Sequence, residues 1–349
     1  MKFISIRNNQ ERDKEMASES PQADVLLELK DLRKWFPVKE QSFVGSRQVA
    51  NIKAVDGVNL IVYKGETLGL VGESGCGKTT TGKVIVKLEV PTTGQVLYRN
   101  QDIYAFNTKE DEMHFKRNVQ MIFQDPYSSL NPRMLIMDII GEGLQIHESK
   151  MPKAQREKQV FNLLDSVGLE DYHAMRYPHE FSGGQRQRIG IARALAVNPE
   201  LVVADEPVSA LDVSVQAQIL NLMQDLQKEF NLTYIFVAHD LSVIKHVSDR
   251  VAVMYLGTIV EFGSNRQVFT RTAHPYSVSL MSAIPRPDPR RKMKRIVLPG
   301  EPPSPINIPS GCRFHPRCYK SDGKKCIKED PPVIEIEDEH YVKCHYPEV

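Results

Sequence analysis

The sequence is poor in the features that mark secreted and membrane-spanning proteins. It has only five cysteines among 349 residues, too few for the disulfide framework of a secreted domain. No stretch approaches the ~18 consecutive apolar residues that a membrane-spanning helix needs. Residues 1–24 are polar and have no apolar core of a secretory signal, and we expect them to be disordered. These absences point to the cell interior, with any membrane role depending on partner chains.

An excess of charge of one sign is also lacking. The 45 basic and 44 acidic side chains leave a net charge of +1, so no overall field attracts nucleic acid or anionic lipid. The composition, 41% hydrophobic and 26% charged, is that of an ordinary globular protein. The length allows one large domain, or a domain of standard size with an extension.

The most informative stretch is residues 72–79, Gly-Glu-Ser-Gly-Cys-Gly-Lys-Thr. It has the spacing of the phosphate-binding loop of nucleotide hydrolases. The apolar residues before it predict a buried strand and those after it predict a helix, so backbone N–H groups and a positive helix end converge on one anion. Lys78 is expected to reach the β- and γ-phosphates, and Thr79 to ligate Mg²⁺. A chance glycine turn is the alternative, which the intact motif disfavours; the sequence predicts a nucleoside triphosphate site.

The rest of the chain up to about residue 284 alternates between strand and helix patterns, which predicts a largely parallel α/β core. Apolar runs at residues 201–204 and 233–238 predict central strands buried on both faces. Residues 49–63 predict two strands around a turn at Asp56-Gly57. The block from 135 to 196 lacks strand signals and predicts a helical insertion.

A second glycine turn lies inside this helical insertion. Residues 181–188 are Phe-Ser-Gly-Gly-Gln-Arg-Gln-Arg, a second candidate anion site at a helix start. From a different subdomain it cannot easily reach the same phosphates within one chain. It can act if it is pressed onto the nucleotide of another subunit. The alternative is an ordinary helix N-cap by Ser182.

With these motifs, residues 25–284 resemble the ATP-binding subunits of ABC transporters. The resemblance implies a P-loop NTPase fold of ABC type, with a RecA-like parallel sheet core, an antiparallel β subdomain and a helical subdomain at about 130–196. A small Cys- and Pro-rich extension, residues 285–349, follows. Two such domains would pair head to tail around two ATP molecules. No motif is degenerate, so we expect a chain that hydrolyses ATP.

The resemblance also implies roles for residues at strand ends. Asp205 would hold Mg²⁺, and Glu206 would polarise the attacking water as general base. His239 matches the switch histidine that contacts the γ-phosphate, although a lone histidine is usually an ordinary core or surface residue. Gln124 matches the glutamine that senses Mg²⁺ and water and couples to the membrane subunits.

Further contacts follow from the same resemblance. Phe36 is the first candidate to stack on adenine and Trp35 the second; both are expected at a loop entry. The remaining expected ATP contacts are Gly72, Glu73, Ser74, Gly75, Cys76, Gly77, Lys78, Thr79 and Thr80. Contacts to the partner's ATP are assigned to Ser182, Gly183, Gly184 and Gln185, and the dimer-interface loop to Ser209, Ala210, Leu211 and Asp212.

Three stretches narrow the resemblance to the oligopeptide/dipeptide importer branch. These are residues 71–78, residues 121–132 (Met-Ile-Phe-Gln-Asp-Pro-Tyr-Ser-Ser-Leu-Asn-Pro) and the tail segments 311–318 and 344–347. The branch implies a heterodimer with a sister ATPase, two transmembrane permeases and an extracytoplasmic solute-binding protein. The chain would then lie at the cytoplasmic face of the inner membrane as a peripheral subunit.

Other functions remain open at this point. A soluble ABC ATPase acting on nucleic acid or ribosomes is disfavoured, because the interval from Lys78 to Asp205 has no coiled-coil or zinc insertion and the net charge is near zero. An exporter motor is disfavoured by the importer-like stretches. The cargo itself is open, since nickel and other solutes use related systems.

Four of the five cysteines lie in the proline-rich tail. A segment so poor in core-forming residues benefits from a metal or covalent staple, and the cell interior argues against disulfides. Four thiolates suit tetrahedral zinc or an iron–sulfur cluster, and their spacing decides little. The resemblance favours a [4Fe–4S] cluster, with unligated buried thiols as the alternative. The candidate ligands are Cys312, Cys318, Cys326 and Cys344.

Overall fold

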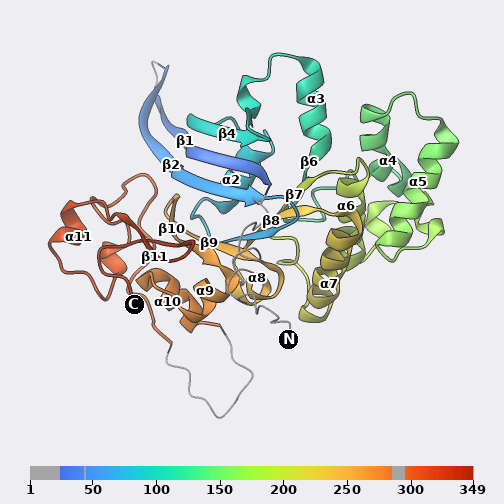
Figure 1. Ribbon diagram of the computed structural model, residues 1–349. Helices are drawn as coiled ribbons and strands as arrows, with labels where there is room; N and C mark the ends of the chain where they lie inside the picture. The colour runs from blue at the N-terminus through green and yellow to red at the C-terminus, as the bar shows by residue number, and fades with distance from the viewer. Residues whose placement is uncertain (1–23, 43–44, 285–294, 349) are drawn as a thin grey trace, which may run out of the picture.

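Two sheets with helices around them make up the fold (Figure 1). The structure, a computed structural model, describes residues 24–42, 45–284 and 295–348; the expected disorder of residues 1–24 thus lies almost wholly outside the described residues. An eight-stranded sheet has the order β11-β12-β10-β9-β3-β8-β7-β6, and a four-stranded sheet has the order β2-β1-β4-β5. The parallel core strands are β3 (Thr67–Val71), β6 (Val119–Ile122), β7 (Leu201–Asp205), β8 (Thr233–Ala238) and β9 (Arg250–Tyr255).

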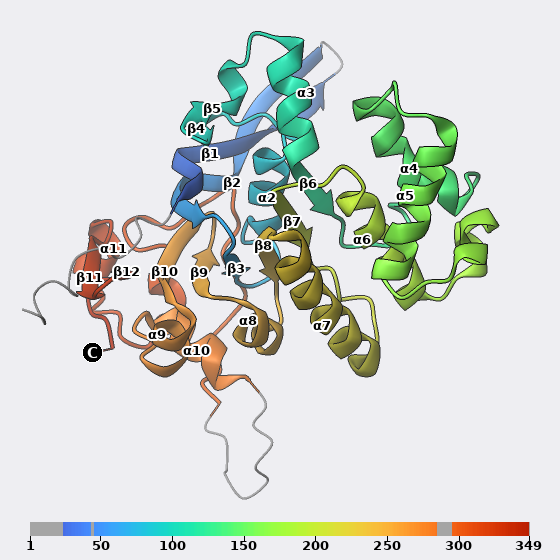
Figure 2. The same ribbon diagram turned by 45° about the vertical axis from the view of Figure 1, so that its right-hand side comes forward.

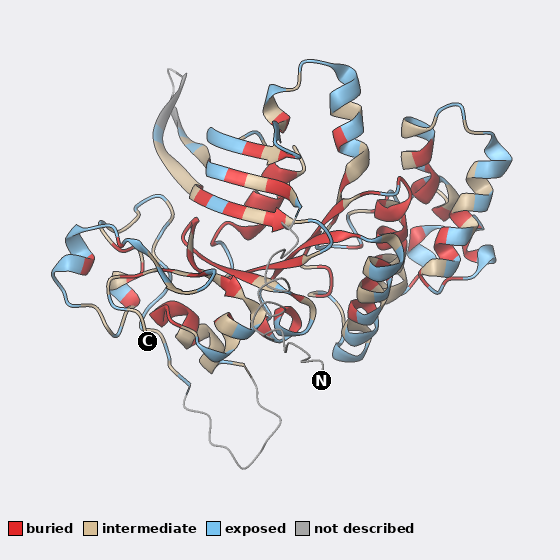
Figure 3. Ribbon diagram, in the orientation of Figure 1, coloured by how far each residue is buried: buried red, intermediate tan, exposed pale blue. Residues whose placement is uncertain are grey.

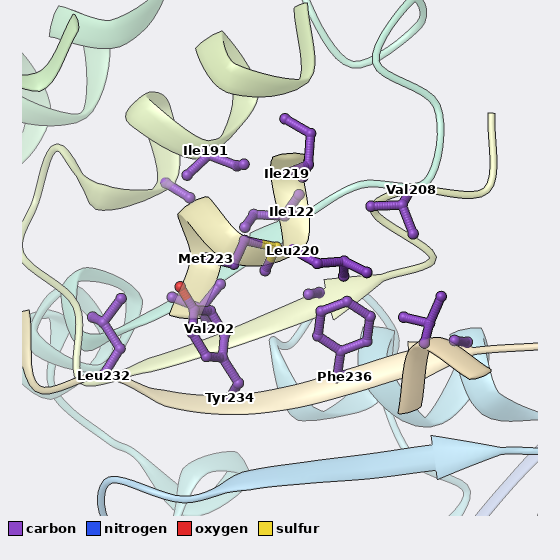
Figure 4. Packing of buried hydrophobic residues seen from close by; sticks show 14 of the residues in the cluster. Ile122, Ile191, Val202, Val208, Ile219, Leu220, Met223, Leu232, Tyr234 and Phe236 are labelled. Atoms are coloured by element: carbon purple, nitrogen blue, oxygen red, sulfur yellow. The ribbon is translucent and has the colours of Figure 1, made fainter. Parts of the chain in front are cut away.

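The parallel strands are buried on both faces, as their continuous apolar runs predict. Neighbouring residues face opposite sides: Leu201 and Val203 belong to one core cluster, Val202 and Ala204 to the other. On one side lies α2 (Lys78–Ile85), between the two sheets. On the other side lies α7 (Val213–Phe230), whose apolar residues meet those of β7 and β8 (Figure 4). Figure 3 shows the central strands in red, as buried.

The four-stranded antiparallel sheet differs from expectation in two places. Its strands are β1 (Val25–Ser42), β2 (Gly45–Tyr63), β4 (Thr93–Tyr98) and β5 (Gln101–Asp102). Residues 49–63 were predicted as two strands and form one, because Gly57 (φ 86°) makes a β-bulge instead of a turn. Trp35 and Phe36, predicted at a loop entry, lie within β1 and pair with Lys53 and Ile52.

Between β6 and β7 the chain is helical and contains no strand, as predicted; every residue of this block is described. Its main helices stand beside the sheets (Figure 2). They are α4 (Ile136–His147), α5 (Lys153–Ser166) and α6 (Gly183–Leu195), with short 3-10 turns at Asp171–Met175 and Pro178–Glu180. Elsewhere, η1 (Ile103–Ala105) and α3 (Lys109–Asn118) precede β6, and α8 (Leu241–Val247) follows β8 with Asp240 as its N-cap.

The Cys-rich tail adds strands to the central sheet, which its sequence did not predict. After β10 (Thr258–Ser264) come α9 (Asn265–Thr270), α10 (Pro275–Ser282), η4 (His315–Arg317), α11 (Lys325–Lys328), β11 (Val333–Glu337) and β12 (His340–Lys343). β12 pairs with β10 through Glu261 with Val342 and Phe262 with Tyr341. No helix in the described part of the chain has the length and hydropathy to cross a membrane.

A buried polar cluster joins α10 to this added hairpin. The Glu261 carboxylate accepts hydrogen bonds from the backbone N–H groups of Ala273 and His274, both at 2.9 Å, and lies 2.9 Å from Nε2 of His340. His274 caps α10 by accepting a hydrogen bond from the Tyr276 N–H at 3.1 Å. Burial lowers the pKa of His274 from 6.5 to about 4.

The low pKa of His274 predicts a loss of stability in weak acid. Between pH 6.5 and about 4, the unfolded state binds a proton that the folded state does not, so the free energy of unfolding falls as the pH falls. The His274→Asn variant keeps a cap acceptor but lacks the titrating imidazole. Between pH 7 and pH 5 we expect its free energy of unfolding to fall by about 2 kcal/mol less than that of the wild type. Denaturant unfolding at both pH values measures this, and equal losses would assign the pH dependence to other groups.

Candidate nucleotide site

A cavity of about 370 Å³ opens at the carboxyl ends of β3, β6, β7 and β8. In a parallel sheet these ends share one edge, where ligands bind in open α/β folds. Residues distant in sequence therefore converge here. The cavity is lined by Ala54, Ser74, Gly75, Gly77, Lys78, Thr79, Thr80, Gln124, Glu206 and His239.

The loop between β3 and α2 runs close to β2 and leaves the start of α2 without a side-chain cap. Gly77 has φ 112°, and a Cβ there would lie 2.1 Å from the carbonyl oxygen of Ala54, so a side chain does not fit. No side chain caps α2. The first-turn N–H groups of this helix are therefore available to an anion.

Lys78 is buried at the start of α2 with its ammonium beneath the loop. Its Nζ donates hydrogen bonds to the carbonyl oxygens of Gly72 at 2.9 Å and Glu73 at 3.1 Å. These contacts fix the cation beside the cavity that it lines. The position agrees with the predicted role of Lys78 as a phosphate ligand.

Thr79 and Asp205 provide the oxygens expected for a magnesium ion. The Thr79 hydroxyl donates to Oδ1 of Asp205 at 2.9 Å, so the two groups are adjacent. Burial raises the pKa of Asp205, with the hydrogen bond from Thr79 opposing that effect. A divalent cation would favour the ionised carboxylate, and hydroxyl and carboxylate oxygens suit Mg²⁺.

Gln124 and His239, predicted to sense the attacking water and to contact the γ-phosphate, both contact Glu206, the predicted general base. Nε2 of Gln124 donates to Oε2 of Glu206 at 2.8 Å, and Nδ1 of His239 lies 3.1 Å from the same oxygen. Glu206 has φ 45°, a conformation that costs energy in a residue other than glycine. The Glu206 N–H holds it there by donating to the carbonyl oxygen of Val237 at 2.9 Å. Strand β8 thus aims the Glu206 carboxylate.

Several predicted site residues lie away from this cavity. Ser182 caps α6, and Gln185 completes a capping box with it; neither residue lines the cavity. Asp212 caps α7, and Leu211 packs beside Gly183. The Lys34 ammonium lies 4.7 Å from the ring centroid of Phe36 in β1, and Phe36 does not line the cavity. Its predicted contact with adenine stays a prediction.

Glu73 and Cys76, two loop residues predicted to contact ATP, face the protein. Cys76 is buried, with its Sγ 3.8 Å from Nζ of Lys78. The Glu73 carboxylate binds Arg317 of the tail. Arg317 lies in the motif at residues 311–318, but nothing in the sequence indicates that this motif neighbours the loop. Nor does the sequence indicate that Ala54, in β2, lines the cavity.

The four tail cysteines line one small cavity with His274, His315 and His345. None of the chain's cysteines forms a disulfide. Burial raises the pKa of the Cys312 and Cys318 thiols, and that of Cys344 to about 11. Within the described residues, no group of three or more His, Cys, Asp or Glu side chains is placed to hold a metal ion. The four cysteines thus lie around one cavity, but they are not arranged as the ligands of a metal ion.

The comparisons with known proteins match both parts of the chain. Residues 55–209 match the family "ABC transporter", and residues 260–326 match "Oligopeptide/dipeptide transporter, C-terminal region". The oligopeptide transport ATP-binding protein AppF of Bacillus subtilis is 51% identical over 92% of this chain and 97% of its own length. The dipeptide transport ATP-binding protein DppF of Escherichia coli is 49% identical over 88% of this chain and 90% of its own length.

Solved structures agree with these relatives. The ATP-binding cassette MJ0796, in a dimeric post-hydrolysis state with ADP and Pi, matches with a TM-score of 0.61 and 29% identity over 69% of this chain and 99% of that one. CbiO1 from Clostridium perfringens matches with a TM-score of 0.59 and 26% identity over 71% of this chain and 92% of that one. The nucleotide cavity and these likenesses lead to one conclusion: the chain belongs to the ATP-binding subunits of ABC transporters and is an ABC ATPase, in the branch whose members are named for oligopeptide and dipeptide transport.

Proposed function

We propose that this chain is the motor subunit of an importer for oligopeptides or dipeptides, in which ATP hydrolysis drives two membrane permeases. One observation carries the proposal. Gln124, Glu206 and His239, the side chains to which we assign hydrolysis, line the nucleotide cavity of a chain whose residues 260–326 match the C-terminal region of oligopeptide/dipeptide transporters. The AppF and DppF relatives, named for peptide transport, support the same cargo class.

We assign the hydrolytic step to Glu206. Its carboxylate accepts a proton from the attacking water as the water approaches the γ-phosphate. Gln124 and His239, both in contact with that carboxylate, orient the water and the γ-phosphate. Lys78 and the N-terminus of α2 hold the phosphates, and Thr79 and Asp205 would hold Mg²⁺, which would neutralise phosphate charge.

The site is completed by a second ATPase subunit. Ser182 and Gln185 at the start of α6 lie outside the nucleotide cavity of their own chain, so they act on the nucleotide of the partner. The dimeric state of MJ0796 supports this arrangement. We infer a sister ATPase as the partner, with the loop from Ser209 to Asp212 at the interface between them.

The remaining partners follow from the peptide-importer assignment. They are two transmembrane permeases and an extracytoplasmic solute-binding protein, and the chain sits peripherally at the cytoplasmic face of the inner membrane. Coupling to the permeases runs through the segment after Gln124. There the guanidinium of Arg186 lies 4.1 Å from the Tyr127 ring centroid, and Arg193 donates to the Ser129 carbonyl oxygen at 2.6 Å. Movement at Gln124 therefore reaches α6 directly.

Purification of tagged Glu206→Gln protein with ATP from its native membranes tests the proposal. We expect two polytopic permeases and a second ATPase to be recovered with it. Competition for uptake between labelled tripeptide and unlabelled peptides, sugars or nickel then identifies the cargo class. Recovery of ribosomes or nucleic acid with no membrane protein would overturn the importer assignment, and inhibition by nickel alone would overturn the peptide cargo.

We also propose that the four tail cysteines hold a [4Fe–4S] cluster. Their gathering around one cavity supports it. Four thiolate ligands suit such a cluster. The cluster would brace a tail that has little apolar core of its own.

Metal analysis of anaerobically purified protein tests the cluster. We expect about four iron atoms per chain and an absorbance band near 400 nm. We expect Cys344→Ser to lose both, while Cys76→Ser, a change of the one cysteine outside the tail, keeps them. One zinc per chain without iron would replace the cluster with a zinc site, and a metal-free folded protein would leave four unligated thiols.

A further inference from the structure

The tail reaches the nucleotide site through an ion pair on the phosphate-binding loop. Nη1 of Arg317 donates to Oε2 of Glu73 at 2.7 Å and Nη2 donates to Oε1 at 3.1 Å. This bidentate geometry is the strongest form of the pair and fixes both partners in orientation. The side chain of Arg317 is only 6% exposed, so water screens the pair weakly.

Three polar contacts hold Glu73, whose side chain is 27% exposed. Its backbone N–H donates to the Tyr276 hydroxyl at 2.8 Å, its carboxylate binds Arg317, and its carbonyl oxygen accepts from Nζ of Lys78 at 3.1 Å. The same residue thus receives the tail's guanidinium on one side and the phosphate-binding lysine on the other. A displacement of Glu73 would displace an acceptor that positions Lys78.

A second route leads from the tail to the same loop. Arg313 donates to the Leu256 carbonyl oxygen at 2.5 Å and to Oδ2 of Asp56 at 2.6 Å. The next residue, Gly257, donates its N–H to the carbonyl oxygen of Cys76 at 2.9 Å. Two arginines of one motif therefore hold the loop at two points, Glu73 and Cys76, on either side of Gly75.

The aromatic side chains between these contacts make the support rigid. Phe314, which lies between the two arginines in sequence, is fully buried. Its ring packs edge-on against Tyr255 at 5.2 Å and lies 5.4 Å from the Tyr276 ring. Tyr276 is the residue whose hydroxyl holds the Glu73 N–H. The tail, β9 and α10 thus form one packed unit behind the loop.

We propose that Arg317 is a positioning residue for ATP binding, which acts through Glu73 to hold the phosphate-binding loop in its nucleotide-accepting form. The tail is then a part of the nucleotide site and not only an appendage of the cassette. The inference requires that the loop bind ATP; it does not depend on the peptide cargo or on a metal at the cysteines. Its failure is therefore distinguishable from failure of the proposed function.

Nucleotide titration of the full chain tests this inference. We expect Glu73→Gln and Arg317→Met each to raise the Kd for a fluorescent ATP analogue about tenfold, and the double variant to raise it no further, because both changes remove one interaction. Arg317→Lys should give an intermediate Kd, since it keeps the charge and loses the bidentate geometry. In the assembled transporter KM for ATP should rise in parallel, with kcat at saturating ATP within about twofold of the wild type.

The control is Lys343→Met, which breaks the 2.8 Å ion pair to Asp330 inside the tail and should leave Kd unchanged. Glu73→Gln alters no residue of the tail. If Arg317→Met fails to fold, the Kd of Glu73→Gln still tests the inference. An unchanged Kd in Glu73→Gln would overturn the inference. So would an equal shift in Lys343→Met, or effects of the two single changes that multiply in the double variant.

Discussion

Glu206→Gln is expected to bind ATP with near wild-type affinity and to lose at least about 100-fold in the rate of hydrolysis. The amide keeps the size of the carboxylate and can still contact Gln124 and His239, whose side chains lie 2.8 and 3.1 Å from it. It cannot accept the proton of the attacking water. The ATP-bound dimer should therefore accumulate, which size-exclusion chromatography with ATP and single-turnover hydrolysis measure.

A matched control lies at the other end of the same strand. Glu200 immediately precedes β7 and binds Arg99, so Glu200→Gln makes the same chemical change on one strand but away from the cavity. We expect that variant to hydrolyse ATP at the wild-type rate. If Glu206→Gln kept rapid turnover with a wild-type partner excluded, His239 would be the better candidate for the base.

The core strands, and the meeting of Gln124, Glu206 and His239 at one edge of the sheet, could be predicted because local patterns determine them. The apolar runs at β7 and β8 bury both faces wherever they lie in the sheet, and parallel strands put their carboxyl ends at one edge. Asp205, Glu206 and His239 follow such runs directly, so their convergence follows from topology. The contacts of Glu206 with Gln124 and His239 agree with that prediction.

Two predictions that depended on backbone detail were wrong. Asp56-Gly57 is a sequence typical of a hairpin turn, yet β2 continues through it, because β1 pairs with β2 on both sides of the bulge. Trp35 carries no local signal for its place in β1. Its indole N–H donates to Oδ1 of Asp56 at 3.1 Å, a partner that becomes its neighbour only once β1 and β2 are paired.

The placement of the tail could not be predicted at all. Strands β11 and β12 have only five and four residues, so their short alternating patterns do not show which strand of the sheet they join. Their pairing with β10 is decided by tertiary contacts. The ion pair between Arg317 and Glu73 spans 244 residues of sequence, and charge pairing over that distance has no signature in a single chain.

Ser182→Arg is expected to leave ATP binding by the isolated chain within about twofold of the wild type and to lower hydrolysis by the assembled transporter at least about tenfold. Ser182 is exposed at the start of α6 and does not line the cavity of its own chain. A cationic side chain there would block the contact with the partner's nucleotide. Calorimetric titration of the chain with ATP and phosphate release by the transporter measure the two effects.

The comparison that isolates this contact is Ser264→Arg. Ser264 caps α9 with a capping box to Gln267, as Ser182 caps α6 with one to Gln185, so both variants lose about 1 kcal/mol of helix capping. Only Ser182 belongs to the expected interface. A normal hydrolysis rate in Ser264→Arg together with a low rate in Ser182→Arg separates catalysis in trans from lost capping. Weakened ATP binding by isolated Ser182→Arg would instead place the start of α6 at its own nucleotide, and the head-to-tail dimer would be wrong.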